Sequence, residues 1–200
     1  MERQAEQHQA GGESTTTTSV AAGDGGWTGA RVIIAGGLLV GVVLGMAGNI
    51  PTEGWLQTLL FAVSSVGLTA ATALLILREA RRGDDLVAAG FAIFTIAEII
   101  VWVGGGPTGP GGEAPFAAAV LFYVPALLLI SVPPRFAFWT RAAGALAALP
   151  FGIHAVVFLL GGNPAEVLQI AGYLLLSVAV IGWAVDVVRS ARSAHGSRVR

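Results

Sequence analysis

The chain has 200 residues, of which 54% are hydrophobic and 12% are charged, and its formal net charge is −1. This composition excludes an ordinary soluble domain and indicates a protein that lies in a lipid bilayer. Lysine and cysteine are both absent, which excludes lysine Schiff bases, a phosphate-binding P-loop, thiol redox chemistry and thiolate metal sites.

Six apolar segments are each long enough to cross about 30 Å of hydrocarbon as a helix. They are residues 32–50, 55–77, 86–103, 116–132, 142–160 and 165–188. We therefore predict an all-α, polytopic integral membrane protein whose six transmembrane helices form three helical hairpins. The transmembrane domain is expected at residues 30–190, between a disordered cytoplasmic tail at 1–29 and a basic cytoplasmic tail at 191–200.

The arginines give the expected orientation. All 11 basic residues precede the first segment or follow the second, fourth or sixth. Because arginine-bearing loops stay on the cytoplasmic side, this distribution predicts a multi-pass protein of the cell membrane with both termini in the cytoplasm. A cleaved signal peptide at residues 31–47 is the competing interpretation of the first segment, which has a basic flank and small residues near its end.

Two of the loops between hairpin helices resemble each other. GNIPTEGWLQ occupies residues 48–57 and GNPAEVLQ occupies residues 162–169, and a third loop rich in Gly and Pro lies at 104–115. When the two similar loops are aligned, Gln57, Phe61 and Ser65 fall opposite Gln169, Tyr173 and Ser177. Each triplet has i, i+4, i+8 spacing and so lies on one helix face.

Two explanations of this resemblance remain open. One is internal duplication of a hairpin. The other is convergence, because Glu53, Glu113 and Glu166 stand where helices are expected to begin, and an acidic residue in the first turn is favoured by the helix dipole. We expect these three acids to act at helix starts rather than as ligands.

Small residues recur at four-residue spacing in the first and fifth segments. Gly37, Gly41 and Gly45 lie in the first, and Gly144, Ala148 and Gly152 lie in the fifth. Such rows allow close helix contact in lipid. They predict packing either within the bundle or between subunits, including an oligomer formed through the first segment. Inside the fourth and fifth segments, prolines are expected to bend the helices.

Ionisable residues within a span are functional candidates, because they are costly in hydrocarbon. Glu98 and His154 each lie twelve residues from the cytoplasmic start of their segment, about 18 Å deep. With Tyr173 and the glutamines Gln57 and Gln169, they define a candidate polar pocket in the outer third of the bilayer. The alternative is a dry hydrogen bond between Glu98 and His154 that ties two helices together.

The remaining features narrow the class of function. Asp186, three residues before Arg189, is expected to form an ion pair at the membrane interface. The sequence lacks the ligand set of a catalytic zinc and the pattern of an intramembrane serine protease, so an enzyme is the least favoured class. No metal, cofactor or nucleic-acid partner is predicted.

Two functions are compatible with these residues. The preferred one is a small-solute or proton-linked transporter or binding protein. The alternative is a non-catalytic membrane scaffold or accessory subunit that assembles through its glycine-rich helix faces.

Overall fold

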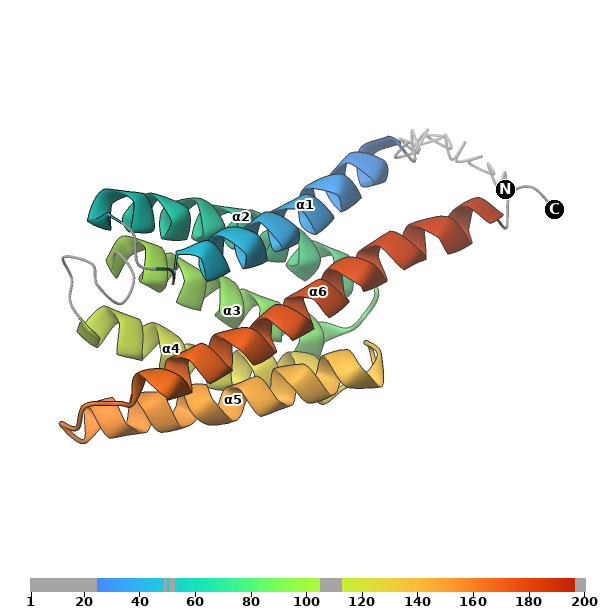
Figure 1. The fold of residues 1–200 in the computed structure, drawn as a ribbon. Helices are drawn as coiled ribbons and strands as arrows, with labels where there is room; N and C mark the ends of the chain where they lie inside the picture. The colour runs from blue at the N-terminus through green and yellow to red at the C-terminus, as the bar shows by residue number, and fades with distance from the viewer. Residues whose placement is uncertain (1–24, 49, 51–52, 105–112, 197–200) are drawn as a thin grey trace, which may run out of the picture.

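The computed structural model describes residues 25–48, 50, 53–104 and 113–196, apart from the side chains of residues 25–28, 113 and 191–196. Its helices are α1 (Gly25–Ala47), α2 (Gly54–Ala80), α3 (Asp85–Gly104), α4 (Glu113–Ser131), α5 (Phe138–Leu159) and α6 (Glu166–Gly196) (Figure 1). All six are long and apolar enough to span a membrane. The prediction of an all-helical, six-span membrane protein is confirmed.

The helix bounds differ from the expected segments mainly at the two ends of the chain. Helix α1 begins at Gly25, inside the segment predicted as a tail, and α6 continues to Gly196, into the predicted basic tail. The rest of the predicted N-terminal tail, residues 1–24, lies outside the described residues. Hydropathy marks the part of a helix that suits hydrocarbon, and a helix can extend beyond it into the interface.

The helices form a closed ring in chain order. Each helix packs against its neighbours in sequence, and α6 packs against α1. Consecutive helices run antiparallel (Figure 1). The predicted hairpins are therefore present, but α2 packs on α3 and α4 on α5 as well, so the three hairpins form one continuous bundle.

The antiparallel ring places the connections at two opposite ends. At one end lie the loops α2–α3 and α4–α5, together with the start of α1 and the end of α6; we call it the arginine-rich end. The ends of α1, α3 and α5 and the starts of α2, α4 and α6 lie at the other end, which we call the loop end (Figure 1).

Two glycines terminate helices with a left-handed backbone. Gly83 after α2 and Gly161 after α5 have φ angles of 79° and 77°. In each case the next residue's amide bonds back to the carbonyl five residues earlier, Asp84 to Glu79 and Gly162 to Val157. This is the Schellman arrangement, which satisfies the last helix carbonyls and reverses the chain direction.

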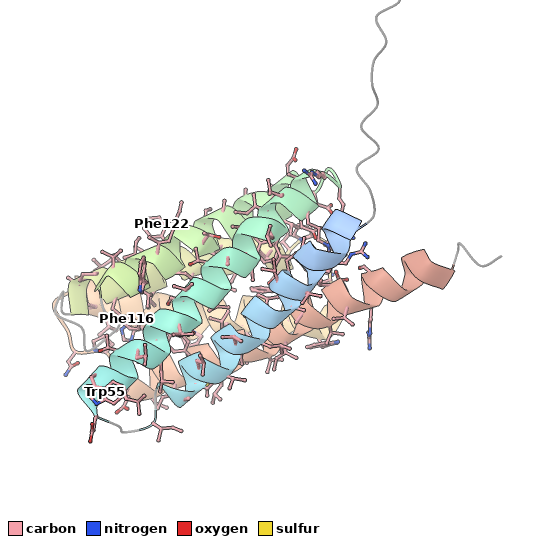
Figure 2. The ribbon with its side chains drawn as sticks, turned by 90° about the horizontal axis from the view of Figure 1, so that it is seen from above. Trp55, Phe116 and Phe122 are labelled. Atoms are coloured by element: carbon pink, nitrogen blue, oxygen red, sulfur yellow. The ribbon has the colours of Figure 1, made fainter. Side chains whose placement is uncertain are left out.

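Apolar side chains cover the outside of the bundle, as a lipid-facing surface requires (Figure 2). Phe122 on α4 is partly exposed, whereas Phe116 on the same helix is buried. At the loop end, the exposed Trp55 donates its indole N–H to Glu53 over 2.7 Å. A tryptophan at a helix end suits the membrane interface.

The glycine rows lie at contacts between neighbouring helices. A Cβ atom at Gly37 would lie 2.6 Å from the carbonyl oxygen of Gly67 on α2, and one at Gly45 would lie 2.9 Å from the hydroxyl of Ser64. A Cβ atom at Gly41 would collide with the side chain of Leu68. The carbonyl of Gly41 accepts a hydrogen bond from the Ser64 hydroxyl over 2.7 Å. The glycine face of α1 thus packs on α2 within the bundle.

In α5, the two glycines face α4. Gly144 lies against Ser131, and a Cβ atom at Gly152 would be 3.4 Å from the side chain of Val124. Both glycine rows therefore serve packing inside one chain.

Candidate functional site

A small cavity, mostly apolar but with several polar side chains in its lining, lies inside the ring between α1, α2, α3, α4 and α6. Its volume is about 40 Å³, and one water molecule needs about 10–15 Å³ of such space. The polar side chains that line it are those of Ser64, Ser65, Glu98, Tyr123, Tyr173 and Ser177. The cavity has room for a few water molecules, and these side chains supply the hydrogen-bond partners that would hold them.

Glu98 is the one acidic side chain among the residues that line this cavity, and it is buried. The Ser65 hydroxyl on α2 donates to its Oε2 over 3.1 Å, and the Tyr123 hydroxyl on α4 donates to its Oε1 over 2.6 Å. A distance of 2.5–2.7 Å is typical of a hydroxyl bonded to an ionised carboxylate. Three helices thus meet at one carboxyl group.

Helical spacing places Glu98 closer to the loop end than to the arginine-rich end. Glu98 is six residues from Gly104, the last residue of α3, and 13 residues from Asp85, the first. At 1.5 Å per residue these separations are about 9 Å and about 20 Å. The carboxyl group lies well inside the apolar bundle, but on the side of the loop end.

The predicted pocket residues divide into two groups. Glu98 and Tyr173 both line the cavity, and Tyr173 also packs edge-on against Phe151, with ring centroids 5.3 Å apart. Gln57, Gln169 and His154 are not among the described residues that line it. Gln57 instead donates to the carbonyl of Gly48 over 3.0 Å.

His154 occupies a separate site between α4 and α5. Its ring packs edge-on against Phe116, with centroids 5.7 Å apart, and it is buried. Glu98 receives its hydrogen bonds from Ser65 and Tyr123. Equal depth in the membrane is therefore not enough to make Glu98 and His154 partners.

Tyr123 is a cavity residue that the sequence reasoning missed, as is Ser64. It is fully buried on α4, two residues before Pro125. A buried tyrosine hydroxyl usually has a hydrogen-bond partner, so a tyrosine in the middle of an apolar span was a usable signal. Its partner on α3 was not readable, because sequence does not say how two helices are rotated relative to each other.

The aligned triplets contribute to the cavity from two sides. Phe61 and Ser65 on α2 line it, and so do their aligned counterparts Tyr173 and Ser177 on α6. The aligned glutamines do not. Internal duplication remains a hypothesis, but four of the six aligned residues share one location.

An aromatic layer separates the cavity from the arginine-rich end. It consists of Phe91 and Phe94 on α3 and Trp183 on α6, and all three are buried. The Trp183 ring lies 5.1 Å from Phe91 and 5.7 Å from Phe94, edge to face in both cases. On the cavity side, Phe94 is 5.2 Å from the ring of Tyr123.

On its other side, the aromatic layer leads to a charged cluster at the arginine-rich end. Phe91 contacts Phe136, with centroids 6.2 Å apart, and the guanidinium of Arg135 lies 5.1 Å from the centre of the Phe136 ring. A cation over an aromatic face is a favourable contact. Aromatic rings thus connect the Glu98 cavity to Arg135.

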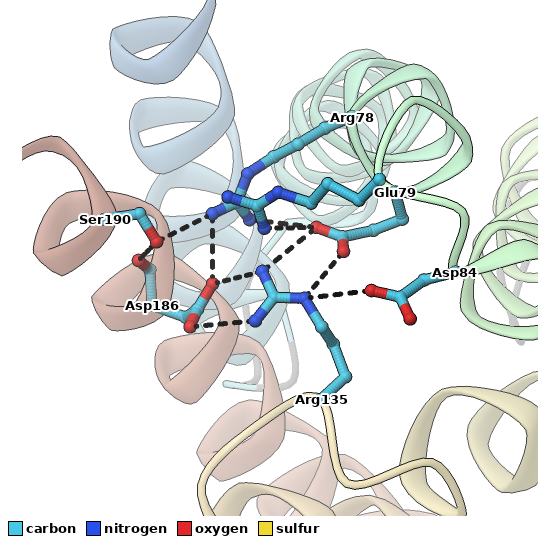
Figure 3. Close-up of polar contacts among 7 residues, drawn as sticks. Arg78, Glu79, Asp84, Arg135, Asp186 and Ser190 are labelled. Atoms are coloured by element: carbon cyan, nitrogen blue, oxygen red, sulfur yellow. Dashed lines mark hydrogen bonds and ion pairs between the residues drawn. The ribbon is translucent and has the colours of Figure 1, made fainter. Parts of the chain in front are cut away.

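The centre of the charged cluster is Glu79, a fully buried carboxylate near the end of α2 (Figure 3). Arg135, from the α4–α5 loop, donates its Nε to Glu79 over 2.7 Å. The guanidinium groups of Arg78 and Arg82 lie 3.1 Å and 3.2 Å from the same carboxylate. Asp84 approaches Arg135 at 3.5 Å.

Asp186 brings α6 into the charged cluster (Figure 3). Its carboxylate accepts hydrogen bonds from Arg78 and from Arg135, both over 3.1 Å, and Arg78 also donates to Ser190 over 3.0 Å. The sequence predicted an interfacial ion pair for Asp186 and considered only Arg189. In the structure the Asp186 carboxylate pairs with Arg78 and Arg135, which belong to other segments and become close only when the ring closes.

Arg135 remains charged in this setting. Burial lowers the pKa of its guanidinium, but the hydrogen bonds to Asp186 and Glu79 outweigh burial, and its pKa lies above the ordinary value. With Arg78 and Arg82 it balances Glu79, Asp84 and Asp186. Charge neutrality and multiple hydrogen bonds make such a buried cluster tolerable.

The site defines the class of protein as a polytopic helical membrane protein with an internal carboxyl-lined cavity. Among the described residues, no group of three His, Asp or Glu side chains is placed to hold a metal ion. Comparisons with protein-family models, curated protein sequences and solved structures gave no significant match.

Proposed function

We propose that this protein is a proton-linked transporter or binding protein for a small solute, and that Glu98 is its proton-exchanging group. The observation that carries the proposal is a buried carboxyl group facing a cavity large enough for water. Ionisable groups inside a membrane domain are costly, and they commonly mark solute or proton pathways.

The partners of Glu98 suit both of its protonation states. When Glu98 is ionised, the hydroxyls of Ser65 and Tyr123 donate to its two oxygens, as in the structure. When Glu98 takes up a proton, the carboxylic acid becomes a donor, and a hydroxyl can rotate to accept from it. The carboxyl group itself can therefore keep a hydrogen-bond partner in both protonation states.

The two ends of the bundle differ in a way that supports one-sided access. The aromatic layer of Phe91, Phe94 and Trp183 lies between the cavity and the charged cluster, which closes the arginine-rich end. The cavity is only about 9 Å from the end of α3 on the other side. We therefore propose that protons reach Glu98 from the loop end.

The proposed orientation follows from the arginines. In a cell membrane, the arginine-rich end is expected in the cytoplasm with both termini, and the loop end is expected outside. Transport additionally requires a second conformation in which the aromatic layer and the charged cluster open toward the cytoplasm.

Single cysteines test whether the cavity is wet, because the natural chain has none. We would replace Ser177, which lines the cavity, with cysteine and measure labelling of intact cells by a membrane-impermeant thiol reagent. Glu53→Cys serves as the exposed control, and Ala155→Cys, at a buried position in the part of α5 near the loop end, serves as the dry control. The proposal expects Ser177→Cys to label at a rate nearer to the exposed control.

A second measurement tests the chemistry. In proteoliposomes with an imposed membrane potential, proton flux is followed with an internal pH-sensitive dye. Glu98→Gln keeps the size of the side chain and imitates the protonated carboxyl group, with one acceptor and one donor side, but it does not exchange a proton, so flux should fall to the level of protein-free liposomes. Glu53→Gln, a change of an exposed carboxyl group at the loop end, should leave flux unchanged.

The alternative is that the Glu98 hydrogen bonds only hold helices together. The bundle contains such a contact elsewhere: the hydroxyls of Thr72 on α2 and Thr95 on α3 lie 2.7 Å apart. If Ser177→Cys labels as slowly as Ala155→Cys and Glu98→Gln has normal flux, the transport proposal is wrong. The scaffold or accessory-subunit hypothesis would then take its place.

A further inference from the structure

A second cavity lies on the outer side of the ring, between α1 and α6 near the arginine-rich end. Its volume is about 280 Å³, several times that of the Glu98 cavity. It is lined by Ala35, Leu39, Ile181, Ala184, Val185, Val188 and Arg189. We call it the α1–α6 groove.

The groove exists because small residues stand where the first and last helices meet. Ala35 on α1 and Ala184 on α6 supply no side chain beyond Cβ to fill the space between the helices. Leu39, Ile181 and Val188 are partly exposed along its sides. The walls are thus apolar and face the surroundings of the bundle, where lipid chains lie.

Positive charge is placed at one end of this groove. Arg189 lines it directly, one turn beyond Val185 on α6. Arg31 stands one turn before Ala35 on α1 and so lies on the same helix face as Ala35 and Leu39. Because α1 and α6 run antiparallel, both arginines lie toward the arginine-rich end (Figure 1).

The length of the groove matches one leaflet of a bilayer. From Arg31 to Leu39, and from Arg189 to Ile181, each helix advances eight residues, or about 12 Å. Half of a hydrocarbon core is about 15 Å. A lipid whose headgroup lies at the arginines would therefore extend its acyl chain along the apolar walls.

We propose that the α1–α6 groove is a binding site for one anionic glycerophospholipid. The phosphate would accept hydrogen bonds from Arg31 and Arg189, since arginine suits phosphate geometry, and an acyl chain would fill the space over Ala35 and Ala184. Basic pockets between transmembrane helices recognise anionic headgroups in this way. The proposal does not depend on the role of Glu98.

Native mass spectrometry of the purified, delipidated protein in detergent tests this site. Phosphatidylglycerol and phosphatidylcholine with identical acyl chains would be titrated in parallel. The wild-type protein should bind the first phosphatidylglycerol molecule more tightly than phosphatidylcholine. The double variant Arg31→Gln/Arg189→Gln should weaken the binding of phosphatidylglycerol by about tenfold to thirtyfold and leave that of phosphatidylcholine unchanged.

Two further variants separate this site from general charge and hydrophobic effects. Ala35→Leu should fill the groove and weaken the binding of both lipids, whereas Ala89→Leu, at an exposed position on α3, should not. Arg81→Gln removes an exposed arginine at the same end that does not line the groove, and it should retain wild-type binding.

The outcomes are distinguishable. Equal affinity for the two lipids, or equal loss of phosphatidylglycerol binding in Arg81→Gln and in the double variant, would overturn the proposal. The proposal would also be overturned if the wild-type protein binds neither lipid and forms a dimer, while Ala35→Leu is a monomer. That result would identify a second copy of the chain as the occupant of the groove. Circular dichroism of each variant verifies that the helices are intact.

Discussion

The Glu79 carboxylate allows a graded prediction, because its three arginine partners differ in exposure. The exposed fractions of the side chains are 7% for Arg78, 17% for Arg135 and 36% for Arg82, while Glu79 itself is at 0%. Ion pairs of solvent-exposed groups contribute about 0–1 kcal/mol. Removing one partner of a buried pair costs about 3–5 kcal/mol, because the other charge is left uncompensated.

Replacing Arg135 with glutamine should therefore be far more damaging than replacing Arg82. Arg135→Gln removes contacts to Glu79, Asp186 and Asp84 together, and we expect a loss of about 3–5 kcal/mol in the free energy of unfolding. Arg82→Gln removes one half-exposed contact to Glu79, and we expect a loss of about 1 kcal/mol or less.

The measurement is reversible unfolding in mixed micelles, with denaturing detergent as the titrant and helix content followed by circular dichroism. The double variant Glu79→Gln/Arg135→Gln should be more stable than the sum of the two single losses predicts, by about 0.5–3 kcal/mol, because the charges are removed together. Since the pKa of Arg135 is raised above its ordinary value, its contribution is present below that value and should persist up to about pH 11.

Two results would contradict this reasoning. Equal losses in Arg82→Gln and Arg135→Gln would mean that burial does not determine the strength of these pairs. Strict additivity of Glu79→Gln and Arg135→Gln would mean that the two side chains do not interact in the folded protein.

Two other substitutions test the packing and the cavity by the same unfolding assay. Gly37→Ala should destabilise the protein by about 1–3 kcal/mol, since its Cβ would lie 2.6 Å from the Gly67 carbonyl oxygen. In the control Gly36→Ala, the new Cβ meets nothing within 4 Å, so this variant should be neutral or slightly stabilising. Equal effects of the two substitutions would exclude the close contact at Gly37. Tyr123→Phe should cost about 1.5–3 kcal/mol, because it removes a 2.6 Å hydrogen bond to a buried carboxyl group. Ser177→Ala removes a hydroxyl that donates to the carbonyl of Tyr173 in its own helix and should cost less. The reverse order would show that the Tyr123 bond is not formed.

The two polar regions of the bundle have different consequences for function. In the charged cluster, ion pairs of Arg78, Arg135, Glu79 and Asp186 link α2, α6 and the α4–α5 loop. The cluster is therefore suited to holding the arginine-rich end closed. The Glu98 cavity has a single carboxyl group with two hydroxyl donors and space beside them. That contrast is why we place proton exchange at Glu98 rather than at Glu79.

The amino-acid sequence by itself determined that the chain is a six-span helical membrane protein. Hydrophobic length is a local property, and a backbone in hydrocarbon must satisfy its own hydrogen bonds, so long apolar segments become helices. The same local reasoning marked Glu98 and Tyr173 as residues that need a polar environment, and it marked the α1 and α5 glycines as sites of close packing.

Only the tertiary structure decided which residues meet. The rotation of each helix about its axis places Tyr123 beside Glu98 and turns His154 toward Phe116. The closing of the ring brings Asp186 to Arg78 and Arg135, more than 50 residues away in each case, and it opens the groove between α1 and α6. In a bundle that is apolar on nearly every face, hydrophobic periodicity does not set these rotations; side-chain packing and the few buried polar contacts do.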